Sequence, residues 1–113
     1  MARTHIAGTE LTTGLVTKHT VPSGVQVTLI EISFLNTDTS NRGITVHFVP
    51  SAGAPGDANR VIHMTAAADN ALRPYEKRVY TLTPFLSVGD FIQASATTAS
   101  VVQLEMSILE EST

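Results

Sequence analysis

The sequence predicts an all-β protein, a single antiparallel β-sandwich of seven to eight strands with jelly-roll or immunoglobulin-like topology and an extended N-terminal arm. Three observations support this prediction. The apolar residues fall into short alternating runs separated by turn residues, which is typical of half-buried strands. Ser and Thr make up 25 of the 113 residues, and Thr favours strands. No segment is long and capped enough to form an independent helix, so the crossovers of a parallel sheet are missing.

The first residues differ from the rest of the chain. Residues 7–14 show neither clean alternation nor a helical repeat. Such a segment is either disordered or held by a neighbour. We therefore expect an N-terminal arm over residues 1–14 and a sandwich domain over residues 15–113.

The strongest strand prediction is Val25–Leu35, which follows a strand at Leu15–Val21 and a turn around Pro22. Within it the apolar residues change from odd to even positions near Leu29 and Ile30. A strand whose apolar face changes in this way contains a bulge or crosses from one sheet edge to another.

A polar loop over residues 36–43 leads into a strand at Ile44–Val49, whose alternation puts His47 on the outward face. Residues 50–59 form a long loop rich in Pro and Gly, and Arg60–Thr65 is a short strand.

Residues 66–72 have the composition of a single helical turn, which Pro74 ends. An apolar turn at residues 84–90 separates two of the remaining strands. The last three predicted strands are Lys77–Thr83, Phe91–Ala96 and Val101–Leu109.

Composition excludes several classes of protein. There is no Cys, so the chain has no disulfides, no thiolate zinc site and no cysteine nucleophile. The formal net charge is −3 and no basic run exceeds two residues, which argues against a nucleic-acid partner. We also expect no signal peptide and no membrane partner, because no apolar run is long enough. Only 15% of the residues are charged, against roughly 25% in typical domains, which suggests a surface covered by a partner.

The titratable residues do not form a catalytic or metal-binding pattern. The four histidines lack the close spacing of ligand pairs, so we interpret them as surface or interface residues, although an oligomer axis could gather three copies of one. The carboxylates lie in turns, at outward strand positions, or in a solvated tail at Glu110–Glu111. We predict no enzyme activity, no metal and no cofactor. The four histidines are His5, His19, His47 and His63, and the candidate carboxylates are Glu31, Asp57, Asp69, Asp90 and Glu105.

One basic group has two interpretations. Arg73, Lys77 and Arg78 lie close together in the sequence. They either form a solvated sheet edge that blocks unwanted pairing or contact an acidic patch on a partner. Arg3 and His5 could act in the second way within the arm.

Three segments together resemble small all-β virion proteins of tailed bacteriophages, some of which are capsid decoration (cement) proteins. The resemblance covers roughly residues 15–109 and consists of turn residues and strand patterning. The segments are Thr20–Val25 followed by Leu29–Ile32 and Asn36–Thr37, then Thr45–Ser51 with Gly53, Pro55, Gly56, Asn59 and Arg60, and finally Leu86, Gly89–Asp90, Ile92–Ala94 and Ala96.

The resemblance implies a non-enzymatic capsid decoration protein, made in the host cytoplasm and located in the virion. It implies a homo-oligomer, in the first place a trimer, whose partner is the major capsid protein. The alternatives are a tail, neck or baseplate protein and a host-surface or carbohydrate-binding module, the latter weakened by the few aromatic residues. Loops on a rigid sandwich are where partners are met, so the arm, the 50–59 loop and the basic group are the candidate contact regions. The alternative for the 50–59 loop is that it is only a long connection. The candidate contact residues are Arg3, His5, Ile6, Pro50, Pro55, Asp57, Asn59, Arg60, Arg73, Tyr75, Lys77 and Arg78.

Overall fold

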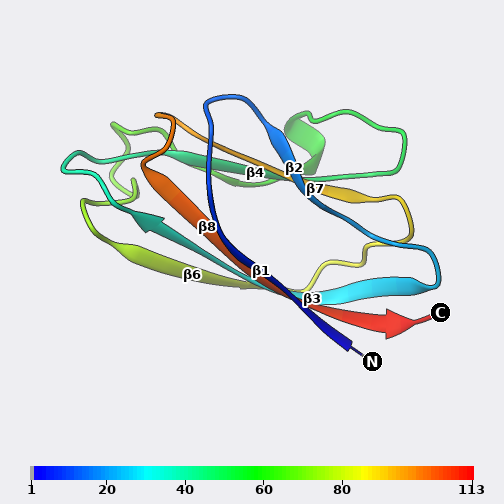
Figure 1. The fold of residues 1–113 in the computed structure, drawn as a ribbon. Helices are drawn as coiled ribbons and strands as arrows, with labels where there is room; N and C mark the ends of the chain where they lie inside the picture. The colour runs from blue at the N-terminus through cyan, green and yellow to red at the C-terminus, as the bar shows by residue number, and fades with distance from the viewer. Residues whose placement is uncertain (1) are drawn as a thin grey trace.

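A computed structural model describes residues 2–113, and over this range the chain forms eight strands in two four-stranded antiparallel sheets (Figure 1). Sheet A has the strand order β1-β8-β3-β6, and sheet B the order β2-β7-β4-β5. The strands are β1 (Ala2–Glu10), β2 (Val16–Thr20), β3 (Val25–Asn36), β4 (Ile44–Val49), β5 (Arg60–His63), β6 (Lys77–Leu82), β7 (Phe91–Ala96) and β8 (Val102–Ser112).

The strand order is that of a jelly roll. The chain passes from one sheet to the other at every connection except β4 to β5, whereas hairpins within one sheet are frequent in an immunoglobulin-like sandwich. The predicted all-β sandwich is therefore confirmed, and its topology is the jelly roll and not the immunoglobulin-like alternative.

The core lies between the sheets and is built by alternation along the central strands. Along β8 the inward residues Leu104, Met106 and Ile108 are fully buried, and Phe34 of β3 meets Tyr80 edge to face at 6.2 Å between ring centroids. Aromatic pairs in this geometry add to the stability gained from burial.

The predicted change of face in the third strand is confirmed as a bulge. The register between β3 and β8 shifts between Val27 and Leu29, which inserts Thr28 as an extra residue. Because of this insertion, Val27 and Ile30 both point into the core although one is odd and the other even.

The segment predicted as an arm contributes β1 to sheet A. Its neighbour is β8 of the same chain, with pairs from Ala2↔Glu110 to Glu10↔Gln103. The register shifts between Ile6 and Thr9, so residues 7 and 8 together oppose Glu105. This bulge is the reason that the sequence shows no clean alternation there.

Two smaller predictions differ from the structure. Glu110 and Glu111 do not form a solvated tail, because β8 continues to Ser112 and turns the Glu110 carboxylate inward, where Thr4 Oγ1 donates a hydrogen bond to it. Residues 66–72 contain turns and no helix, and the helical turn of the described chain is instead a 3₁₀ turn at Asp57–Asn59. No helix in residues 2–113 has the length and apolar character to span a bilayer.

Candidate interaction surfaces

Three loops meet at the end of the sandwich where the chain termini also lie (Figure 1). Asp90 joins two of them. Its Oδ2 accepts a hydrogen bond from the Ser87 backbone N–H and its Oδ1 accepts one from the Ser51 N–H, both at 2.9 Å. The sequence assigns Asp90 to local turn geometry, and the structure adds this link to the 50–59 loop.

Backbone hydrogen bonds hold the third loop in the same cluster. The N–H of Val21 donates to the carbonyl of Asp90, and the N–H of Gly89 donates to the carbonyl of Val21, both at 2.9 Å. Leu86 and Val27 exchange two further bonds of 2.9 Å. Loops 21–24, 50–56 and 84–90 are thus fixed relative to one another, and we call their exposed side the loop-end surface.

The loop-end surface carries two large exposed apolar side chains. Phe85 is 70% exposed and Val88 is 54% exposed, whereas Leu86 between them is buried. Pro22 and Pro50 on the adjoining loops are also exposed. Exposed apolar groups on a rigid scaffold are typical of a protein-contact surface. The sequence predicts an apolar turn here, but no sequence signal marks Phe85 or Val88 as exposed.

Gly89 allows the close approach of two of these loops. Its φ is +85°, and a Cβ built there would lie 2.5 Å from Ser51 Oγ. We expect Gly89→Ala to lower the free energy of unfolding by about 2 kcal/mol, because the left-handed backbone and the collision both cost energy. The measurement is urea denaturation, with Gly14→Ala as control because a Cβ at Gly14 meets nothing within 4 Å. Equal losses in the two variants would contradict the locked contact.

The 50–59 loop folds back on the outer face of sheet B. His47 Nδ1–H donates to Asn59 Oδ1 at 2.7 Å, and Asn59 Nδ2 donates to the Ala54 carbonyl at 3.0 Å. His47 faces outward as predicted but is buried, because the loop covers it. Of the candidate residues in this loop, Asn59 holds the loop together, while Pro50, Pro55 and Asp57 are exposed, as is Arg60 at the start of β5.

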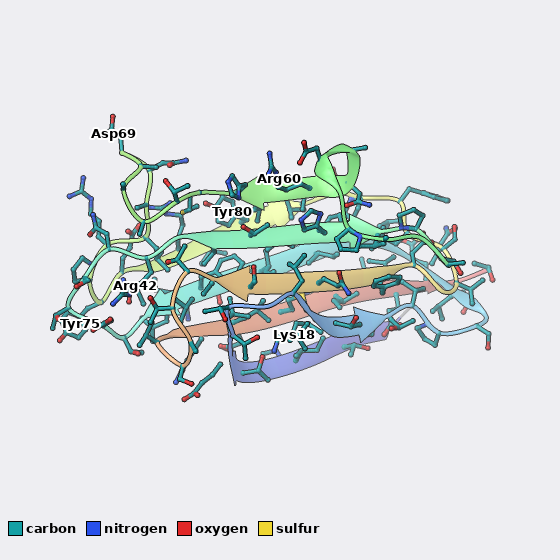
Figure 2. All side chains as sticks on the ribbon, turned by 90° about the horizontal axis from the view of Figure 1, so that it is seen from above. Lys18, Arg42, Arg60, Asp69, Tyr75 and Tyr80 are labelled. Carbon is teal, nitrogen blue, oxygen red and sulfur yellow. The ribbon has the colours of Figure 1, made fainter. Side chains whose placement is uncertain are left out.

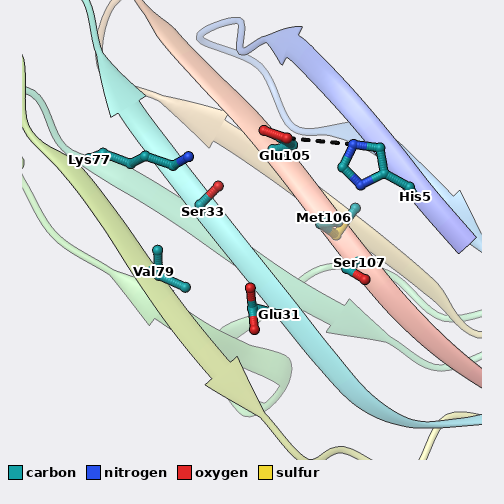
Figure 3. A pocket seen from close by; sticks show the side chains of 8 residues that line it. All are labelled: His5, Glu31, Ser33, Lys77, Val79, Glu105, Met106 and Ser107. Carbon is teal, nitrogen blue, oxygen red and sulfur yellow. Dashed lines mark ion pairs between the residues drawn. The ribbon is translucent and has the colours of Figure 1, made fainter. Parts of the chain in front are cut away.

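The outer face of sheet A contains a shallow hollow of about 120 Å³ (Figure 3). His5 Nε2 lies 3.5 Å from Glu105 Oε1 on one side of it, and Lys77 lies on the other side. Arg3, the other basic residue of the arm, donates to Ser107 Oγ at 2.9 Å, whereas Ile6 points inward against the core. The described residues contain no group of three potential metal ligands.

The basic group does not converge on one surface. Lys77 lies on the outer face of sheet A, whereas Arg78 turns the other way and donates to the carbonyls of Asn70 and Ala71 at 2.6 and 3.3 Å. Arg78 Nε also donates to Glu76 Oε2 at 3.0 Å. Arg78 thus holds the loop before β6, which is neither the solvated edge nor the partner contact that the sequence predicts for it. Arg73 itself is exposed.

Tyr75 lies at the opposite end of the molecule from the loop-end surface. Figure 2 shows it at the same end as Arg42 and Asp69. It is 67% exposed and has a left-handed backbone, with φ of 58°. Because β6 separates Tyr75 from Phe85, the two exposed aromatic rings cannot bind one small ligand together.

The carboxylate of Glu76 predicts a pH dependence of stability. The backbone N–H of Arg73, followed by the Arg78 guanidinium, holds the pKa of Glu76 below its ordinary value. A carboxylate with a lowered pKa stabilises the fold above its unfolded-state pKa, and this contribution is lost as the pH falls through the folded-state pKa. We expect Glu76→Gln to reduce the difference in the free energy of unfolding between pH 7 and about pH 3. Urea denaturation measures it, and an unchanged difference would contradict the prediction. Exposed Glu31→Gln is the control.

The jelly roll is shared with two solved structures. One is from the Bacillus endospore appendages, described as a family of disulfide-linked pili, with a TM-score of 0.57 and 11% identity over 98% of this chain and 85% of the other. The second is the tobacco streak virus coat protein dimer, with a TM-score of 0.59 and 12% identity over the same shares of the two chains. No protein-family model and no curated protein matches the sequence.

These likenesses define the chain as a member of the jelly-roll class of β-sandwiches. At this level of identity they establish the fold and nothing narrower. The pili are linked by disulfides, whereas this chain has no Cys, so the same linkage cannot form between its copies.

Proposed function

We propose that this chain is a non-enzymatic structural protein of a virion, and specifically a decoration protein on the head of a tailed bacteriophage. The observation that carries the proposal is the loop-end surface, where hydrogen bonds to Asp90 hold Phe85 and Val88 exposed on a fixed set of loops. A preorganised apolar surface loses little conformational entropy when a partner covers it. The partner is the major capsid protein.

The mechanism is mechanical. Each copy bridges neighbouring capsid subunits and opposes internal pressure through many individually weak contacts. The jelly roll suits this role because its two packed sheets present loops at both ends. The likeness to a virus coat protein that forms a dimer supports self-association as part of the role, and the proposed oligomer is a trimer. The remaining candidate contacts belong to the same proposal: Arg3, His5, Pro50, Pro55, Asp57, Arg60, Arg73 and Lys77. Tyr75 lies at the opposite end of the sandwich, outside the proposed loop-end interface.

The position in the virion is tested by immunogold labelling of particles from the source lysate, with antiserum to the purified chain. Gold spread evenly over the heads supports a decoration protein. Gold confined to a tail or vertex rejects decoration and favours a tail, neck or baseplate protein. If no particle is labelled, the virion role is rejected and screening for glycan binding follows. The solution mass of the purified chain tests the trimer separately.

A further inference from the structure

The first half of β1 makes few apolar contacts with the core. Arg3 and His5 are exposed, Thr4 and Ile6 are half-buried, and Ile6 is the large apolar side chain that this segment packs against the core. The bulge at residues 7 and 8 separates Ala2–Ile6 from the rest of the strand. Opening this segment therefore exposes little apolar surface, and local opening is easiest where such contacts are few.

The chain is firmly anchored just beyond the bulge. Leu11 is fully buried, its N–H donates to the Val102 carbonyl at 2.8 Å, and its carbonyl accepts from the Ser100 N–H at 3.0 Å. The carbonyl of Thr12 accepts from the Ala96 N–H at 2.9 Å. The bulge is also uncrowded, because a Cβ at Gly8 would meet only the Gln103 side chain, at 3.6 Å. Ala2–Ile6 can thus leave without disturbing the residues that follow Leu11.

The side-chain contacts that would be lost are polar and lie on β8. Arg3 donates to Ser107 Oγ, His5 approaches Glu105, and Thr4 Oγ1 donates to the buried Glu110 carboxylate. A buried carboxylate deprived of its hydrogen-bond donor is unfavourable, and so is an exposed edge of β8. Pairing of a new segment with the vacated edge of β8 is therefore favourable, and only a segment with the same residues restores every contact.

We propose that Ala2–Ile6 is exchanged between copies of this chain, so that the segment of one copy pairs with β8 of a second copy. The occupant follows from the structure, because β8 already binds this segment in antiparallel register. Exchange preserves the contacts within each sheet and needs only a hinge and a high local concentration. The proposal rests on the proposed assembly role, which would supply that concentration and gain a link between subunits.

The absence of native Cys allows a direct test. His5 pairs with Ser107 across β1 and β8, and residues opposite each other in antiparallel strands are close enough for a disulfide. His5→Cys chains and Ser107→Cys chains are purified separately, mixed in the folded state at high concentration and oxidised. We expect a disulfide-linked heterodimer, identified by mass spectrometry of the linked peptides. Arg3→Cys mixed with Leu109→Cys tests a second pair of the same register.

Thr81→Cys provides the matched control. Thr81 is exposed on β6 of the same sheet and pairs with Glu31 of β3. Two strands, β8 and β3, therefore lie between Thr81 and His5. His5→Cys chains are mixed with Ser107→Cys chains in one reaction and with Thr81→Cys chains in the other. The expected yield of disulfide-linked heterodimer is several-fold higher in the first reaction. Equal yields, together with an internal disulfide in the His5→Cys/Ser107→Cys double variant, would overturn strand exchange. If the immunogold experiment labels phage heads but no heterodimer forms, strand exchange is rejected and the virion role stands. If the heterodimer forms but no particle is labelled, the virion role is rejected and strand exchange stands.

Discussion

On the proposed decoration role, Phe85→Ser combined with Val88→Ser is expected to abolish binding of the purified chain to phage heads, while the free energy of unfolding stays within about 0.5 kcal/mol. Both side chains are largely exposed, so their removal leaves no cavity in the core. At an interface, by contrast, a buried aromatic anchor contributes about 2 kcal/mol or more, which is a loss of roughly 30-fold in affinity for Phe85 alone. Cosedimentation with particles depleted of the native protein measures the effect.

Tyr75→Asn is the matched control for this variant. Tyr75 is about as exposed as Phe85 but lies at the other end of the sandwich, and Asn tolerates its left-handed backbone. We expect Tyr75→Asn to bind particles normally. If Tyr75→Asn loses binding and the double variant keeps it, the contact surface is at the opposite end, and the loop-end surface is not the interface.

The strands that the sequence predicts best are those in which alternation and turn residues agree. Ile44–Val49 and Phe91–Ala96 have the predicted bounds, because turn residues such as Gly43, Pro50 and Gly89 delimit short segments with a period of two. β1 was not predicted as a strand because the bulge at residues 7 and 8 breaks its alternation. The strand order could not be predicted, since pairs such as β1 with β8 join the two ends of the chain.

The candidate surfaces were less predictable than the strands. Phe85 and Leu86 are adjacent apolar residues in a turn, and nothing in the sequence indicates that the first is exposed and the second buried. The burial of His47 depends on how the 50–59 loop folds back, because the covering Asn59 lies in that loop. The sequence identified this loop as a candidate contact region. It could not indicate that Asp90, far along the chain, fixes its first residues through Ser51.

At the end of the sandwich opposite the loop-end surface, the buried side chain of Asn36 links two loops. It is fully buried at the end of β3. Its Nδ2 group donates to the carbonyls of Ser40, Leu72 and Arg73 at 2.9, 3.1 and 3.1 Å. Its Oδ1 accepts from the Asp38 N–H at 2.9 Å. One side chain thus supplies hydrogen bonds to both the 37–43 loop and the loop before β6.

We expect Asn36→Ala to lower the free energy of unfolding by about 3 kcal/mol or more, because it removes all four hydrogen bonds of a fully buried side chain and leaves a cavity in its place. Asn36→Asp keeps the acceptor for Asp38 but loses the donor and adds a charge, so it should be no more stable than the Ala variant. Asn41→Ala, at an exposed position in the same loop, should change stability by less than about 0.5 kcal/mol. Urea denaturation compares the three variants. A loss below about 1 kcal/mol in Asn36→Ala, the size of one ordinary hydrogen bond, would mean that the two loops are held by other contacts.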